Sequence, residues 1–247
     1  MMELLVSHGA DVNAAWNGNF PIIFSPCEAV DPIPLKWLLD HGADPNCEGN
    51  GQVTALDYLI GSYWRSPNLS LCIEHLLDAG GVTRYDVPGV LDILRSRLDE
   101  LREHLQDNPA LVNRRFPELD FGASGTRRLL LQGATLLHVA AEYGNVEAAR
   151  LLLYHGADVN ARASVDENGV GGQTAIFHAV TQFNDSGLAV AQLLIDHGAD
   201  LSIRVKLPGH YEQLDEVVEC TPLGYARRFP GVEGKTVALL RERGGVE

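Results

Sequence analysis

The side chains best able to do chemistry in this sequence are nine histidines and an acidic run near the C-terminal end. The run consists of His210, Glu212, Asp215, Glu216 and Glu219. Imidazole and carboxylate groups can bind zinc or manganese, so the run together with His178 could build a metal-dependent hydrolase or a small-ligand site. Neither a nucleophile motif nor zinc-ligand spacing accompanies these residues, and a solvated acidic loop is the simpler interpretation.

Other candidate chemistry has a structural alternative. Four histidines precede a glycine in the same local phrase, and there they can bond the last carbonyls of a helix. They are His8, His41, His155 and His197. The segment 169–174 (GVGGQT) resembles a phosphate-binding loop only faintly, because it has no lysine. We therefore expect no catalytic residues, no cofactor and no metal.

Charge and cysteine content exclude some classes of function and indicate a compartment. The chain has 19 Lys and Arg against 33 Asp and Glu, a net charge of −14, which opposes binding to nucleic acid. The N-terminus shows no signal peptide, and no apolar stretch is long enough to cross a membrane. The four cysteines form no C-x-x-C pair and indicate a reducing compartment, so we expect a cytoplasmic, monomeric protein.

The elements that would position these side chains follow from one recurring phrase. It runs from a Leu-Leu pair through His-Gly-Ala-Asp, as at 4–13, 38–46, 152–160 and 193–200, with weaker copies at 76–81 and 239–244. The leucines close the apolar face of a helix, and the glycine can end that helix in the left-handed conformation. A spacing that begins at 33 residues, from Gly9 to Gly42, and then lengthens indicates a repeat array.

Predicted helix starts precede four of these phrases, with a threonine 21 to 26 residues before the glycine. Thr54, Thr135, Thr174 and Thr221 are placed to cap a first helix. A second cap follows at Asp31 and at Asn145, ahead of the leucine pair. Each unit is thus predicted to be helix, turn, helix and projecting loop.

This pattern resembles the ankyrin repeat family, most closely at 133–160. The resemblance implies an all-α solenoid of stacked helix-turn-helix units with projecting hairpin loops, forming one domain over 1–247. Units are expected at about 1–16, 17–50, 51–84, 85–115, 132–162, 172–204 and 219–247. The first would be partial, which raises the prospect of a fragment, and the last would be a polar C-terminal cap.

Two departures from the pattern predict irregular structure. The fourth unit carries one apolar stripe from Val90 to Leu105, which predicts a single long helix of roughly four turns or more. Three insertions, 116–132, 163–172 and 205–219, interrupt the units. Such loops usually carry function, and the resemblance places them beside a concave face.

The resemblance also identifies candidate partner-binding residues. In the family, the residue after the inner-helix histidine, here His138, points to the concave groove. This inner-helix row is Phe24, Tyr58, Val139, His178 and Tyr225, with Trp16, Tyr143, Arg227 and Arg228 nearby. Aromatic side chains dominate binding hot spots, so Tyr58 and Tyr225 are expected to contribute to affinity. Alternatively, the insertions fold over the groove and bury the row.

The sequence thus predicts a non-catalytic scaffold that binds a protein partner through its concave face and loop edge. Its acidity favours a partner with a basic or mixed-charge surface. The alternative is a metal-dependent hydrolase or small-ligand site around His178 and His210. The sequence does not identify the partner.

Overall fold

The computed structural model describes residues 1–49, 51–62, 65–122, 129–209, 216–229 and 234–247. It divides into two compact units, unit 1 (Met1–Asp86) and unit 2 (Val87–Glu247). The sequence predicted one domain over 1–247, and this division is the first difference from that expectation.

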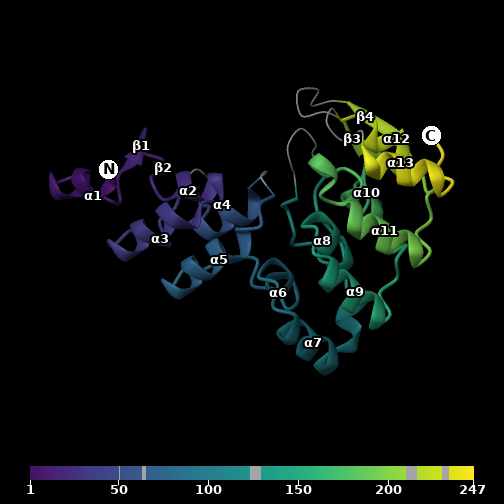
Figure 1. Cartoon of the computed structure of the whole chain (residues 1–247), viewed down its shortest axis with the longest axis horizontal. Coiled ribbons are helices and arrows are strands. Elements are labelled where there is room, and N and C mark those ends of the chain that lie inside the picture. The colour runs from purple at the N-terminus through teal and green to yellow at the C-terminus, as the bar shows by residue number, and fades with distance from the viewer. Residues whose placement is uncertain (50, 63–64, 123–128, 210–215, 230–233) are drawn as a thin grey trace. The chain divides into compact units, whose positions relative to one another are not determined.

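Unit 1 is built from short antiparallel helices and one small hairpin. Its helices are α1 (Met2–Ser7), α2 (Phe24–Ala29), α3 (Pro32–Asp40), α4 (Ala55–Gly61) and α5 (Leu69–Asp78). The hairpin pairs β1 (Ala15–Trp16) with β2 (Phe20–Pro21). Helix α2 packs on α4, and α3 packs on α5, so first and second helices form separate layers (Figure 1).

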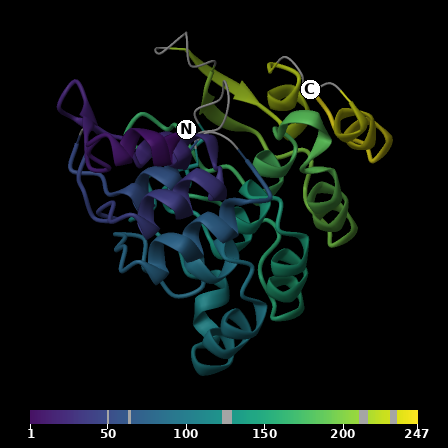
Figure 2. The same ribbon diagram turned by 60° about the vertical axis from the view of Figure 1, so that its left-hand side comes forward.

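Unit 2 repeats the same two-layer arrangement. Its helices are α6 (Val90–Leu94), α7 (Leu98–Asp107), α8 (Leu136–Glu142), α9 (Val146–Tyr154), α10 (Ala175–Ala179), α11 (Leu188–Asp196), α12 (Pro222–Ala226) and α13 (Lys235–Glu242). Two 3₁₀ turns, Pro109–Asn113 and Phe183–Asp185, and the antiparallel strands β3 (Val205–Pro208) and β4 (Val217–Cys220) complete it. Helices α8, α10 and α12 form one layer and α9, α11 and α13 the other, as the turned view also shows (Figure 2). The predicted all-α solenoid is confirmed.

The predicted helix ends are confirmed in detail. Six glycines that follow a second helix have φ between 85° and 89°, namely Gly9, Gly42, Gly80, Gly156, Gly198 and Gly244. The preceding histidines bond the helix end as expected: Nδ1 of His41 donates to the Trp37 carbonyl at 2.7 Å, and Nδ1 of His197 to the Leu193 carbonyl at 2.8 Å. These histidines therefore have a structural role.

The predicted helix starts are confirmed as well. Thr54 and Thr221 accept hydrogen bonds from backbone N–H groups inside α4 and α12. Asp31 and Asn145 do the same for α3 and α9. Each satisfies a backbone donor that the helix itself leaves unpaired.

A ladder of asparagines joins consecutive repeats. Each Asn side chain donates to the carbonyl of the next repeat's helix-ending glycine at 2.9–3.1 Å and accepts from a backbone N–H two residues further on at 2.8 Å. The pairs are Asn13 with Gly42, Asn46 with Gly80, Asn113 with Gly156, and Asn160 with Gly198. The loop stack is therefore held by side chain–backbone bonds as well as by apolar packing.

We predict that Asn160→Ala lowers the free energy of unfolding by about 1–3 kcal/mol, because two bonds to backbone groups are lost at once. Urea unfolding followed by circular dichroism measures the change. Asn168→Ala is the matched control, because Asn168 is exposed and its side chain makes no hydrogen bond with the described residues. Equal unfolding midpoints for the two variants would show that the ladder does not stabilise the stack.

The ladder residue is missing where the two units meet in the sequence. Four residues after the helix-ending glycine, Asn is present at 13, 46 and 160, whereas Arg84 follows Gly80 and Ser202 follows Gly198. A missing asparagine therefore does not by itself mark the division into units, because only the first of these two repeats lies next to it.

The single long helix predicted from Val90 to Leu105 is wrong. The segment forms α6 and α7, separated at Ser96, which adopts the left-handed conformation with φ of 56°. The Ser96 and Arg97 N–H groups donate to the Ile93 and Asp92 carbonyls and close the first helix. The apolar stripe continues across this break, and neither glycine nor proline signals it. The fourth unit is therefore a normal helix pair whose exit turn, Pro109–Asn113, retains the ladder asparagine.

Candidate functional site

An aromatic cluster lies on the first-helix layer of unit 1. Phe24, on α2, stacks on Tyr58, on α4, with ring centroids 4.7 Å apart. Phe20 meets both rings edge-on, at 5.6 Å and 5.8 Å. Phe24 is 2% exposed and serves as the base of the cluster, whereas Phe20 and Tyr58 are half-buried. The inner-helix row thus remains partly accessible in this unit.

The β1–β2 hairpin adds Trp16 to this surface. Trp16 lies directly opposite Phe20 in the strand pair, and its side chain is 74% exposed. Asn17 and Gly18 turn the chain with φ of 51° and 76°, and the Asn19 N–H donates to the Trp16 carbonyl at 3.2 Å. The short turn between β1 and β2 therefore keeps the Trp16 side chain exposed to solvent. Sequence reasoning identified Trp16 but missed Phe20, whose position opposite a tryptophan across Asn-Gly was the available signal.

The electrostatics of unit 1 favour cations. Residues 1–86 contain 3 Lys and Arg against 11 Asp and Glu, a net charge of −8 out of −14 for the whole chain. Exposed Glu48 precedes Gly49, which lies directly against the Phe24 ring. A Cβ at Gly49 would come within 2.5 Å of Phe24 Cε2, so this acidic loop packs closely on the aromatic cluster.

In unit 2 the inner-helix row is buried, so the prediction that its side chains are exposed is wrong for this unit. Val139, His178 and Tyr225 are each 0% exposed. Insertions contact the row at Tyr225 and beside it at Tyr143: the Tyr225 hydroxyl donates to the Pro208 carbonyl at 3.1 Å, and Phe121 contacts Tyr143 with ring centroids 6.2 Å apart. The alternative that insertions fold back over the groove therefore agrees with the contacts of Tyr225.

The remaining predicted contact residues of unit 2 lie nearer the surface. Tyr143 is half-buried at the end of α8. Arg227 follows α12 with 39% of its side chain exposed and forms an ion pair with Glu247. Arg228 pairs with Glu216.

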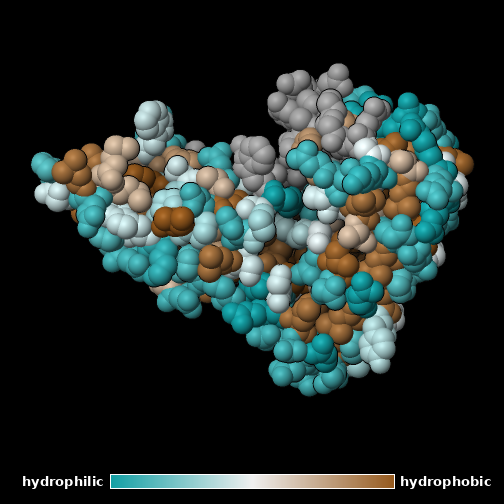
Figure 3. Space-filling view, in the orientation of Figure 1, coloured by the Kyte–Doolittle hydropathy of each residue, from teal (hydrophilic) through white to brown (hydrophobic). Residues whose placement is uncertain are grey.

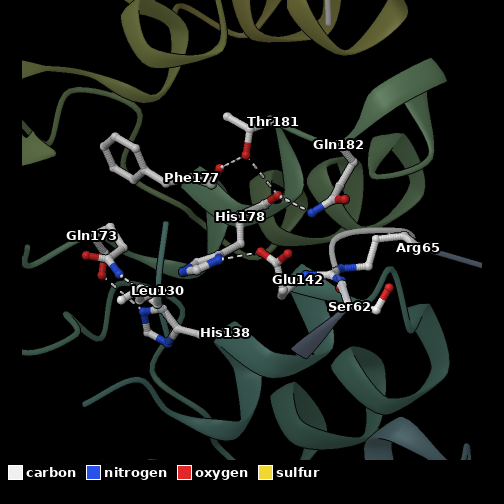
Figure 4. A network of polar contacts seen from close by, with 10 residues as sticks. All are labelled: Ser62, Arg65, Leu130, His138, Glu142, Gln173, Phe177, His178, Thr181 and Gln182. Atoms are coloured by element: carbon white, nitrogen blue, oxygen red, sulfur yellow. Dashed lines mark hydrogen bonds and ion pairs between the residues drawn. The ribbon is translucent and has the colours of Figure 1, made fainter. Parts of the chain in front are cut away.

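A buried polar network lies between α8 and α10. His178 Nδ1 is 2.7 Å from Glu142 Oε2, and both side chains are 0% exposed (Figure 4). Thr181 and Gln182 donate to backbone carbonyls of the same helix, including that of His178. Because the Glu142 carboxylate accepts the N–H of the His178 imidazole, this pair can stabilise the packing of α8 against α10. Sequence reasoning missed Glu142, since one acidic residue at the end of an apolar helix gives no distinctive signal.

His138 takes the position expected for the family histidine. Its Nδ1 accepts the Thr135 backbone N–H at 3.2 Å, and its Nε2 donates to the Gln173 carbonyl of the next repeat at 3.0 Å. Burial, together with nearby His178, lowers the pKa of His138 from 6.5 to about 3. The ring is therefore neutral at pH 7 and links two repeats.

The residues of the alternative metal or hydrolase site are not brought together within the described chain. Groups of three or more His, Cys, Asp or Glu side chains able to hold a metal ion are absent from it. His178 is engaged by Glu142, while His210, Glu212 and Asp215 lie outside the described residues. Glu219 is exposed on β4.

The four cysteines are unpaired, and burial raises the pKa of Cys72 and of Cys220 to about 12.

Within the described residues, no helix is long and apolar enough to span a membrane. The space-filling view shows hydrophilic residues with hydrophobic ones gathered at the α1 end and over the region of α8, α9 and α11 (Figure 3). In α1, Leu4 and Leu5 are 62% and 55% exposed.

Comparisons with known proteins agree with this geometry. A family model of ankyrin repeats, in three copies, matches residues 107–205. Ankyrin repeat protein B18 of Vaccinia virus (strain Copenhagen) is 30% identical over 172 residues, covering 65% of this chain and 27% of that protein. The chain therefore spans about a quarter of the length of this viral relative.

Two further likenesses cover nearly the whole chain. A Bos taurus protein described as dynein axonemal heavy chain 12 is 24% identical over 277 residues, covering 98% of this chain and 68% of that protein. The ankyrin repeat domain of human ASB11 is 22% identical and covers 100% of this chain and 93% of its own, with a TM-score of 0.45. The repeated helix pairs, the glycine helix ends and the asparagine ladder agree with the family match: residues 107–205 match ankyrin repeats, and the chain is similar to ankyrin repeat proteins.

Proposed function

We propose that the chain is a protein-interaction module without catalytic activity and that it binds its partner through the first-helix layer and hairpin edge of unit 1. One observation carries the proposal. Trp16, Phe20 and Tyr58 present aromatic surface in unit 1, whereas the inner-helix row is buried in unit 2. Aromatic residues that stay accessible on a folded repeat usually mark an interface.

The charge of unit 1 indicates the chemistry of the partner. A net charge of −8 over residues 1–86 favours a basic or mixed-charge protein surface and disfavours nucleic acid. An aromatic face beside carboxylates is a suitable environment for Lys or Arg side chains. Such binding should weaken as salt is added, and strengthening with salt would contradict this assignment.

Of the candidate residues in unit 2, Tyr143 and Arg227 stay in the proposal as contributors at the loop edge, because neither is fully buried. Phe24, Val139, His178 and Tyr225 are core residues that support the surface from below. Their substitution should change stability before it changes affinity.

Alanine at Trp16 is expected to weaken partner binding by about 2 kcal/mol, roughly 30-fold, as for an aromatic hot spot. Affinity capture with the full chain, followed by mass spectrometry, supplies the partner, and titration calorimetry then measures the loss. Because Trp16 is 74% exposed, the melting temperature should stay unchanged. Tyr58→Ala should weaken binding similarly, with some loss of stability from its stacking on Phe24.

Leu71→Ala is the matched control for these variants. Leu71 is 48% exposed on the second-helix layer, away from the aromatic cluster. It should leave affinity unchanged. If Leu71→Ala weakened binding while Trp16→Ala and Tyr58→Ala did not, the partner would occupy the opposite layer and the proposed surface would be wrong.

A further inference from the structure

A pocket of about 270 Å³ opens at the loop edge of unit 2. Its walls come from three segments: 129–132, 164–173 and strand β3. At about 30 Å³ for each water molecule of liquid, the volume corresponds to roughly nine waters, enough for one or two side chains. Neither the ankyrin match nor the aromatic surface of unit 1 assigns a role to this pocket.

The pocket has a mixed lining that includes apolar side chains inside and at its rim. Leu129 and Leu207 are each 1% exposed and lie among its lining residues. Leu130 and Val165 are 40% and 55% exposed, so hydrophobic surface remains in contact with water at the rim. An aliphatic side chain entering here would remove this surface from water, which is the main source of favourable binding energy for such a group.

The polar side chains of the pocket are Gln132, Ser164, Asp166 and Gln173. Gln173 is 4% exposed, and its Nε2 donates to the Leu130 carbonyl at 2.9 Å. Asp166 is the only charged side chain among the described residues that line the pocket. Its Oδ1 accepts the backbone N–H groups of Asn168 and Val170, both at 2.8 Å. A positively charged group on a ligand would therefore be complementary to the charge of the lining.

Backbone hydrogen bonds hold the pocket in shape. Gly171 donates to the Lys206 carbonyl at 2.7 Å, and Gly172 donates to the Ser164 carbonyl at 3.0 Å. Gly171 has φ of 115°, and a Cβ there would lie 2.3 Å from the Ser164 carbonyl oxygen. The second insertion and β3 are thus fixed to each other, and a preformed pocket loses little entropy when a ligand enters.

We propose that this pocket binds an extended segment of a partner protein in which an aliphatic side chain stands next to Lys or Arg. The aliphatic group fills the space between Leu130, Val165 and Leu207, and the cation pairs with Asp166. The proposal rests on the proposed function, since it adds a second recognition element for a protein partner at the loop edge.

Three blocked dipeptides test the pocket directly by NMR titration of the ¹⁵N-labelled full chain. They are Ac-Leu-Arg-NH2, Ac-Leu-Glu-NH2 and Ac-Gly-Arg-NH2. The first should shift the backbone signals of Leu130, Val165 and Gly171 and the side-chain amide of Gln173 at concentrations up to about 10 mM, given the modest affinity of a ligand this small. It should bind about 3- to 10-fold more tightly than each of the other two.

Two variants separate the contribution of the Asp166 charge to peptide binding from that of the apolar rim. Asp166→Asn keeps the Oδ1 acceptor of the turn and should remove the preference for Arg over Glu. Val165→Ser should weaken both leucine peptides, whereas Leu71→Ser, an exposed leucine in unit 1, should change neither. Equal shifts with all three peptides, or no shifts in the pocket, would overturn the proposal. Shifts confined to Trp16 and Tyr58 would also overturn it, while leaving the proposed interface of unit 1 intact.

Discussion

Glu142→Ala is expected to lower the free energy of unfolding of unit 2 by about 3–5 kcal/mol, because it leaves the His178 imidazole in the core without its carboxylate partner. The two side chains are 2.7 Å apart and both are 0% exposed, so water cannot compensate for the loss. Urea unfolding followed by circular dichroism reports on both units. Tryptophan fluorescence reports on unit 1 alone, since the three tryptophans are Trp16, Trp37 and Trp64.

Two comparisons test the cause of this destabilisation. Glu147→Ala, at an exposed ion pair near the start of α9, should change the free energy of unfolding by less than about 1 kcal/mol. Replacing both Glu142 and His178 with leucine should recover much of the loss, because neither member of the pair is then left in the core without the other. If the double leucine variant were as unstable as the sum of the Glu142→Leu and His178→Leu single variants, the two residues would act independently. The broken pair would then not be the cause of the destabilisation.

Acid should destabilise unit 2 through His138. The pKa of this histidine is lowered to about 3 in the folded chain and is near 6.5 when unfolded, so only the unfolded chain gains a proton between these values. This stabilising contribution is complete above pH 6.5 and is lost as pH falls toward 3. The loss between pH 6.5 and pH 5 amounts to about 2 kcal/mol, at 1.36 kcal/mol per pH unit.

Unfolding free energies measured by urea denaturation from pH 7.5 to 5 test this prediction. His138→Leu is expected to be less stable than the wild type at pH 7.5, because its bond to Gln173 is lost, but to show a shallower slope with pH. Identical slopes for the two proteins would mean that His138 is not the group that takes up the proton.

Local signals in the sequence predict much of this fold. The helix ends depend on local residue types, such as glycine after the second helix and threonine before the first. The glycines and the caps at Thr54 and Thr221 are confirmed, whereas Thr174 precedes α10 without a cap bond from its side chain. The break at Ser96 was not predictable in this way, because serine rarely adopts a left-handed conformation and the apolar stripe runs on through it.

The fate of the inner-helix row could not be predicted from local sequence. Whether Tyr58 or Tyr225 faces solvent depends on where distant insertions pack, as with the Pro208 carbonyl that accepts the Tyr225 hydroxyl. The sequence indicates that these insertions exist, but their apolar residues, Phe116 and Leu131 among them, give no direction for their packing. The same is true of Glu142, whose partner lies 36 residues away.

Hydrogen–deuterium exchange of the full chain, with and without the captured partner, tests the central claim most directly. Binding through the aromatic surface of unit 1 should slow exchange in β1–β2 and in α4 while leaving α3 and α5 unchanged. Protection confined to α3 and α5, or absent from unit 1 altogether, would contradict the proposed interface.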